Sequence, residues 1–85
     1  MTANKKILKK QIIYRSMHRG TKEMDLLLGN FVKTHIDEFN STELKDLANL
    51  LFTEDEVIYK WYFEKNLDNV IPKTKVSTML KNFKL

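Results

Sequence analysis

Apolar residues recur along most of this chain at the spacing of an amphipathic α-helix. The clearest stripe begins at Met24 and continues, in steps of three and four residues, to Phe39. Such steps place side chains on one face of a helix, whereas a half-buried strand alternates at every second residue. The pattern therefore predicts a helix over residues 21–38. Its apolar face comprises Met24, Leu27, Leu28, Phe31, Val32, His35, Ile36 and Phe39.

Two glycines and an asparagine help to bound and place the first two helices. Asn4 is a favourable N-cap for a helix that begins at residue 5. Gly20 is expected to end that helix, because glycine readily takes the left-handed conformation common at helix ends. Gly29 lies inside the second helix, where glycine is unfavourable, and it indicates a close approach of another backbone.

Capping patterns also mark the third and fourth helices. Asn40 with Glu43 three residues later resembles a capping box, and Thr53 with Glu56 is a second one. The segment around the only proline is expected to be a connection, and a short apolar stripe after it predicts a last helix. The five predicted helices span residues 5–18, 21–38, 42–52, 54–66 and 73–83.

Length and composition limit the architecture that these helices can build. The chain has 85 residues, with two Gly, one Pro and no Cys. One domain, 1–85, is expected at this length, with a thin core and no large interior pocket. So few turn-forming residues disfavour a β architecture. We therefore predict an all-α fold, a small five-helix bundle. The lack of Cys excludes disulfides, zinc–thiolate sites and thiol catalysis.

The net charge of +4 is unevenly distributed along the chain. Residues 1–22 carry seven basic groups and no acid, residues 23–68 have a net charge of −7, and residues 69–85 carry four lysines and no acid. Non-specific nucleic-acid binding needs a continuous basic face. Such a face would form only if the two termini fold together. A small basic helical nucleic-acid-binding protein is therefore the alternative function rather than the preferred one.

Neither catalysis nor metal binding is indicated by the polar residues. His18 and His35 are not at metal-ligand spacing, and no phosphate loop or nucleophile motif is present. The acidic run from Glu54 to Glu56 is typical of a helix first turn, where carboxylates are favourable. The aromatic residues around Trp61 are at helical spacing, which favours core packing over base stacking. We predict that the chain is not an enzyme and binds no metal.

The N-terminal residues also raise the question of membranes and targeting. No stretch approaches the ~18 apolar residues of a membrane-spanning helix, so no membrane insertion is expected. Residues 1–19 are basic and free of acids, a composition shared with mitochondrial transit peptides. We prefer to interpret them as the first helix of the domain, because the core would be small without them. Binding of this segment to a membrane surface is a more distant alternative.

One segment has features that local structure alone does not account for. Both arginines of the chain, Arg15 and Arg19, fall within it, beside Gly20 and two carboxylates, Glu23 and Asp25. Arginine offers a planar fork of donors that suits carboxylates, and it is enriched at protein interfaces. Carboxylates in the middle of the segment would repel phosphates. The arrangement thus favours a binding surface for a protein partner over one for nucleic acid.

At these residues the chain resembles the succinate dehydrogenase assembly factor family, also called the flavinylation factors. Arg19, Gly20 and Glu23 match its Arg-Gly-x-x-Glu hallmark, and Asp25 follows in the same order. The later run of residues 55–61, which ends in Trp61, is similar to the family's acidic helix start leading to a Trp. The similarity covers residues 12–83. Members often carry a second basic residue at the position of His18 and a proline near Glu56, and this chain has neither.

The resemblance implies a five-helix bundle that binds the flavoprotein subunit of succinate dehydrogenase and promotes covalent attachment of FAD to that subunit. It implies that the partner-binding residues are Arg15, Arg19, Gly20, Glu23 and Asp25. No stable binding of FAD by the factor itself is expected, because the chain has no dinucleotide fingerprint. Service to fumarate reductase is left open. We expect a monomer in the bacterial cytoplasm, or in the mitochondrial matrix of a eukaryote.

Overall fold

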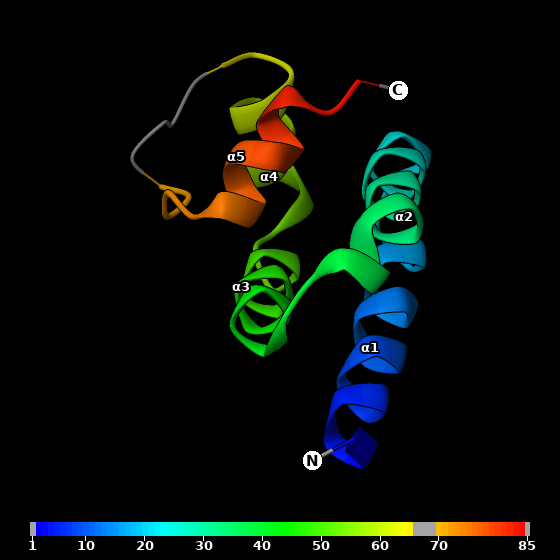
Figure 1. Ribbon diagram of the computed structural model, residues 1–85. Helices are drawn as coiled ribbons and strands as arrows, with labels where there is room; N and C mark the ends of the chain where they lie inside the picture. Colours follow the sequence, from blue (N-terminus) through cyan, green and yellow to red (C-terminus); the bar gives the residue numbers. More distant parts are fainter. Residues whose placement is uncertain (1, 66–69, 85) are drawn as a thin grey trace.

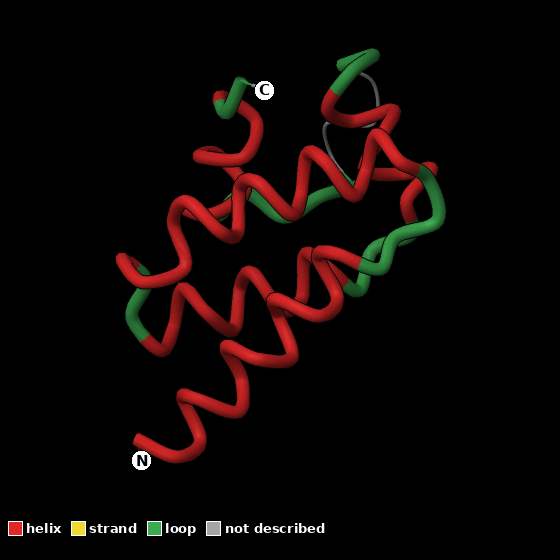
Figure 2. Tube along the Cα trace, turned by 90° about the vertical axis from the view of Figure 1, so that its right-hand side faces the viewer, coloured by secondary structure: helices red, strands yellow, loops and turns green. Residues whose placement is uncertain are grey.

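The computed structural model describes residues 2–65 and 70–84, and these residues form helices and loops without a strand (Figures 1 and 2). The predicted all-α fold is confirmed. The two ends of the chain lie at opposite ends of the molecule in both views. The elements are α1 (Thr2–Met17), α2 (Lys22–His35), the 3₁₀ turn η1 (Ile36–Glu38), α3 (Ser41–Leu51), α4 (Asp55–Tyr62) and α5 (Lys75–Asn82).

The bounds of α1 differ from the predicted 5–18. The helix begins at Thr2, so Asn4 lies within it rather than capping it. It ends at Met17, and Gly20 does not have a positive φ, so the left-handed stop predicted there is wrong. The ring of His18 donates from Nδ1 to the carbonyl oxygen of Tyr14 at 2.8 Å. This bond serves one of the carbonyls that a helix C-terminus leaves without a backbone donor.

The helices that follow confirm one predicted cap and contradict another. Predicted helix 21–38 becomes α2 plus η1, and α3 begins behind the expected capping box of Asn40 and Glu43. The box at Thr53 is wrong, because Glu54 is the N-cap of α4 and makes no side-chain capping bond. The carbonyl of Thr53 instead accepts a hydrogen bond from Arg19 in a distant part of the chain.

The last two helices are shorter than predicted. Helix 54–66 ends at Tyr62, and Lys65 has a φ of 56°, in the left-handed region that stops helix propagation. Position 66 of that prediction lies outside the described residues. Helix 73–83 becomes Lys75–Asn82, and it has a capping box between Thr74 and Ser77 that the sequence analysis did not identify.

The core lies where the apolar faces of the helices meet. His35 is half-buried beside Phe31 and hydrogen-bonded to Glu38, as expected for a satisfied histidine on an apolar stripe. Trp61 is buried, which agrees with its predicted packing role. The buried apolar residues are Ile12, Met24, Leu27, Leu28, Phe31, Val32, Ile36, Phe39, Leu44, Leu47, Leu50, Leu51, Ile58, Trp61, Ile71, Val76 and Leu80.

Some apolar residues remain at the surface, contrary to the simplest interpretation of the pattern. On α1, Ile12 is buried, while Ile13 and Met17 are exposed, although the apolar residues of this segment also recur at helical spacing. The aromatic cluster of α4 is also divided, because Tyr59 and the following Phe63 are exposed and contact each other. Helical spacing predicts that these apolar residues lie near one another, but it does not determine how much of each helix surface the other helices cover.

Candidate functional site

The connections α1–α2 and α3–α4 meet at one corner of the molecule, and Arg19 joins them. Its Nε donates to Oδ1 of Asp55 at 2.6 Å. Its Nη1 donates to the carbonyl of Leu51 at 2.7 Å, and Nη2 to that of Thr53 at 2.8 Å. The planar guanidinium thus binds the end of α3 and the start of α4 to the α1–α2 connection. We call this arrangement the Arg19–Asp55 clamp.

The Arg19–Asp55 clamp is largely shielded from water. The side chain of Arg19 is 9% exposed and that of Asp55 is 22% exposed. Charge-assisted hydrogen bonds are strong, and a buried charge is tolerated only where such bonds satisfy it. The bonds made by Arg19 meet that condition, so the clamp fixes the local backbone. The sequence predicted Asp55 only as a carboxylate in the first turn of a helix, and its pairing with Arg19 was not predicted.

Gly20 completes the clamp through its backbone. Its N–H donates to Oδ2 of Asp55, the second oxygen of the carboxylate that pairs with Arg19. A Cβ at this position would lie 2.8 Å from the same oxygen. That separation is too short for an ordinary contact, so a side chain here would have to displace the carboxylate of Asp55.

Asp25 also forms a hydrogen bond within the chain. Its Oδ1 accepts a hydrogen bond from the backbone N–H of Arg19 at 2.6 Å. Asp25 lies in the first turn of α2, and the hydroxyl of Thr21 caps that helix by accepting from the N–H of Met24. The N-terminus of α2 and the backbone of Arg19 are therefore held together.

The other two predicted residues point to solvent. Glu23 is exposed, and no hydrogen bond or ion pair in the described parts of the chain engages its carboxylate. Arg15 is exposed as well, and its guanidinium carbon lies 4.0 Å from the centre of the Phe52 ring. The five residues predicted from sequence thus occupy one corner, but in two roles. Arg19, Gly20 and Asp25 shape the corner, whereas Arg15 and Glu23 present charge from it.

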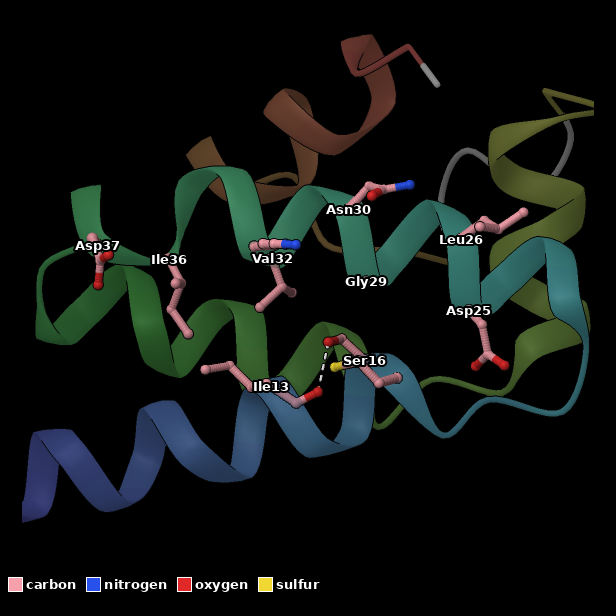
Figure 3. A pocket seen from close by; sticks show the side chains of 11 residues that line it. Ile13, Ser16, Asp25, Leu26, Gly29, Asn30, Val32, Ile36 and Asp37 are labelled. Atoms are coloured by element: carbon pink, nitrogen blue, oxygen red, sulfur yellow. Dashed lines mark hydrogen bonds between the residues drawn. The ribbon is translucent and has the colours of Figure 1, made fainter.

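Three surface hollows border this corner, and one of them lies beside Gly20 and Tyr59. The other two include Arg15 or Asp25 in their lining. One, of about 400 Å³, is lined by the Arg19–Asp55 clamp together with Tyr14, Arg15 and Phe52. The other is an apolar groove of about 590 Å³ between α1 and α2, shown in Figure 3. There Ile13 of α1 faces Val32 and Ile36 of α2, and the hydroxyl of Ser16 donates to the carbonyl of Ile13 at 2.8 Å. Both are open surface features, in keeping with the thin core.

The described residues can be compared with the requirements of a metal site and of a membrane-spanning helix. They contain no group of three or more His, Cys, Asp or Glu side chains placed to hold a metal ion. None of the helices formed by the described residues is both long and apolar enough to cross a membrane.

Away from the corner, the pKa of Glu43 is lowered below its usual 4.5, chiefly by the backbone N–H of Asn40 and then by Lys75.

The chain is thus a small all-α protein with a charged corner. There the Arg19–Asp55 clamp joins the α1–α2 and α3–α4 connections, beside exposed aromatic and ionic side chains. Residues 10–84 match the family described as flavinator of succinate dehydrogenase. The chain belongs to that family, and the resemblance based on Arg19, Gly20 and Glu23 is thereby confirmed.

Curated relatives of both bacterial and mitochondrial origin are similar to the chain. The "FAD assembly factor SdhE" of Acetobacter pasteurianus is 33% identical over 73 residues, covering 86% of this chain and 64% of the relative. The "Succinate dehydrogenase assembly factor 2, mitochondrial" of Scheffersomyces stipitis is 42% identical over 78 residues, covering 88% and 51%. The protein of that name from Arabidopsis thaliana is 34% identical over 62 residues, covering 73% and 33%.

The chain spans from about a third to just under two thirds of the length of these three relatives. No solved structure matches it.

Proposed function

We propose that this chain is an assembly factor that binds the flavoprotein subunit of succinate dehydrogenase and promotes the covalent attachment of FAD to that subunit. The observation that carries the proposal is membership of the flavinator family over residues 10–84. Relatives named as FAD or succinate dehydrogenase assembly factors support it. They favour it over the nucleic-acid-binding alternative, for which the uneven charge is the only support.

The partner-binding corner comprises Arg15, Arg19, Gly20, Glu23 and Asp25. Glu23 and Arg15 are exposed and supply charges that a partner can contact. Arg19 and Asp25 hold the backbone around Gly20 through internal bonds, so the corner is rigid before the partner arrives. A surface that is already ordered loses less conformational entropy on binding.

In this proposal the factor favours the conformation of the flavoprotein in which the flavin becomes attached, and it is not itself the catalyst. FAD stays with the flavoprotein, and the factor binds no cofactor stably. A fumarate reductase flavoprotein is a second candidate partner. The factor acts as a monomer in the compartment where the flavoprotein is assembled, which is the bacterial cytoplasm or the mitochondrial matrix.

Glu23→Ala tests the proposal in a strain that lacks this protein. Covalent flavin on the succinate dehydrogenase flavoprotein is read by in-gel fluorescence after denaturation. The wild-type chain is expected to restore the fluorescence, and Glu23→Ala to restore about a tenth of it or less, because a lost charged contact costs ~1.5–3 kcal/mol. Asp37→Ala is the matched control, because its carboxylate is 91% exposed in η1, just beyond the C-terminal end of α2.

The control variant should restore flavin attachment as the wild type does. Equal covalent flavin in the strain with and without this protein would contradict the proposal. A fluorescent flavoprotein band restored by Glu23→Ala as fully as by Asp37→Ala would remove Glu23 from the partner-binding corner.

A further inference from the structure

The two arginines of the corner differ in exposure and in hydrogen bonding. Arg19 is nearly buried, and Nε, Nη1 and Nη2 all donate to acceptors within the chain. Arg15 is exposed, and within the described chain no carboxylate or carbonyl accepts from its guanidinium. A guanidinium carries five N–H donors in a rigid plane. Arg15 therefore has its donors available to a partner.

The side chain of Phe52 holds Arg15 in position. The guanidinium carbon of Arg15 lies 4.0 Å from the ring centre, within the range of a cation–π contact. A guanidinium that lies over the face of an aromatic ring keeps its own N–H groups free to donate hydrogen bonds in its plane. Phe52 itself is 65% exposed, at the end of α3, so its ring is also open to contact.

A pair of stacked aromatic rings also lines this hollow. The rings of Tyr14 and His18 stack with their centres 3.9 Å apart, and the His18 ring is bonded to the Tyr14 carbonyl. Tyr14 is 63% exposed. Side chains restrained in this way lose little freedom when a partner covers them. The four residues Tyr14, Arg15, His18 and Phe52 line one hollow of about 400 Å³, and we call them the Arg15–Phe52 surface.

The charges around the hollow indicate what it can accept. Asp55, which lines it, is paired with Arg19, so it offers little free charge. Glu54 also lines the hollow and is exposed, and Arg15 supplies the unpaired positive charge. One free cation beside a carboxylate is a poor site for a nucleic-acid backbone, whose binding depends on neutralising several phosphates. It suits a single carboxylate accompanied by an apolar side chain.

We propose that the Arg15–Phe52 surface docks a segment of the flavoprotein partner that presents a carboxylate next to an apolar side chain. The carboxylate pairs with the guanidinium of Arg15, and the apolar side chain covers the rings of Phe52 and Tyr14. Arg19 is a positioning residue that keeps the two connections together beneath this surface. The inference rests on the proposed function and adds to it the chemistry of the contact.

Binding of the purified, full-length chain to the isolated flavoprotein subunit of succinate dehydrogenase tests the inference. Arg15→Ala and Phe52→Ala are each expected to weaken the affinity about tenfold or more. Arg15→Lys is expected to recover little, because an ammonium group cannot supply the planar fork. The affinity of the wild type should also fall more steeply with salt than that of Arg15→Ala.

Lys45→Ala and Ile7→Ala are matched controls. Lys45 is an exposed cation on α3, and Ile7 is an exposed apolar side chain on α1, two turns before Arg15. Both controls should bind as the wild type does, and all variants should keep the wild-type melting temperature to within a few degrees. That pattern would separate loss of contact from loss of fold.

The possible failures are distinguishable. If the wild-type chain binds the flavoprotein and Arg15→Ala and Phe52→Ala bind equally tightly, the docking surface is overturned and the proposed function stands. If the wild-type chain shows no binding to the flavoprotein, both proposals fail. Loss of binding to a single-stranded RNA oligonucleotide in Arg15→Ala, with flavoprotein binding unchanged, would also overturn the inference.

Discussion

Arg19 shows how one side chain can determine the shape of a surface without lying on it. Its guanidinium replaces the water that would otherwise solvate the carbonyls of Leu51 and Thr53. A lysine at this position could not reach the same acceptors in one plane. The Arg19–Asp55 clamp is therefore a structural requirement for the corner, and its loss should be visible in stability as well as in binding.

Arg19→Ala is expected to lower the free energy of unfolding by about 2–4 kcal/mol, because it leaves Oδ1 of Asp55 and two carbonyls without their donor. Asp55→Asn should cost less, about 1–2 kcal/mol, since an amide keeps one acceptor for Gly20 or Arg19. Urea unfolding followed by circular dichroism measures both. Midpoints of both variants within error of the wild type would show that the clamp contributes little.

The two glycines of the chain are expected to respond differently to substitution by alanine. At Gly29, an added Cβ would lie 3.8 Å from the carbonyl oxygen of Ser16 and from Cγ of Met17, which is ordinary contact. The backbone of α1 does pass close to Gly29, as predicted, but it leaves room for a methyl group. Gly29→Ala should therefore stabilise the protein by about 0.5–1 kcal/mol through helix propensity.

At Gly20 the same change is expected to destabilise, because the new Cβ would lie 2.8 Å from the carboxylate of Asp55. Thermal melts of Gly29→Ala and Gly20→Ala give the comparison directly. The first should melt several degrees above the wild type and the second below it. A melting temperature lowered by Gly29→Ala would mean that α1 and α2 pack more tightly than this structure shows.

At the scale of elements, the helix ends depend on bonds of different range. The cap of α3 is local, since Asn40 and Glu43 bond to each other and lie three residues apart. The same carboxylate also pairs with Lys75 at the start of α5, with Nζ and Oε2 3.0 Å apart. Glu43 therefore joins the start of α3 to the start of α5, and its ionisation should affect both helices.

Stability should depend on pH through Glu43. Its folded-state pKa lies below the ordinary 4.5, because the N–H of Asn40 and the ammonium of Lys75 favour the charged form. A lowered pKa contributes stability that is present above the unfolded pKa and is lost as the pH falls through the folded one. Wild type should thus exceed Glu43→Gln in melting temperature at pH 7.

The difference between wild type and Glu43→Gln should shrink as the pH falls below 4.5 and through the folded pKa of Glu43. Thermal melts of both proteins between pH 7 and pH 3 follow this difference and cancel the effect of the other carboxylates. A gap that is constant with pH would show that the charge of Glu43 contributes nothing beyond its hydrogen bond.

At the scale of the whole molecule, Phe31 lies at the centre of the packing. It is fully buried on α2, and its ring meets those of Phe39 and Phe83, the latter edge-on at 5.4 Å. Phe83 follows α5, so this contact links the second helix to the last. A domain of this size has a small core, and one large cavity removes much of its stability.

Phe31→Ala is expected to cost about 3–5 kcal/mol and to lower the melting temperature by ten degrees or more. Calorimetry measures the loss, and Phe52→Ala is the control because its ring is 65% exposed. The control should change the melting temperature by only a few degrees. Equal losses in the two variants would contradict the assignment of Phe31 to the core and of Phe52 to the surface.

Local patterns in the sequence predicted the helices and most of the core. The period of the apolar positions located the buried face of α2, and Asn40 with Glu43 marked the start of α3, because these signals act over a few residues. Residues that act locally can be identified from local patterns. The Arg-Gly-x-x-Glu pattern likewise marked the corner that carries the proposed site.

The role of each polar residue at that corner depends on contacts between distant segments. Arg19 bonds to Asp55 across 36 positions of sequence, and α4 begins behind Glu54 rather than at the cap predicted at Thr53. In that pairing Arg19 lies inward, while Arg15, four residues earlier, is exposed over Phe52. Hydrogen bonds and ion pairs between distant segments depend on where the helices pack, and no local periodicity encodes that placement.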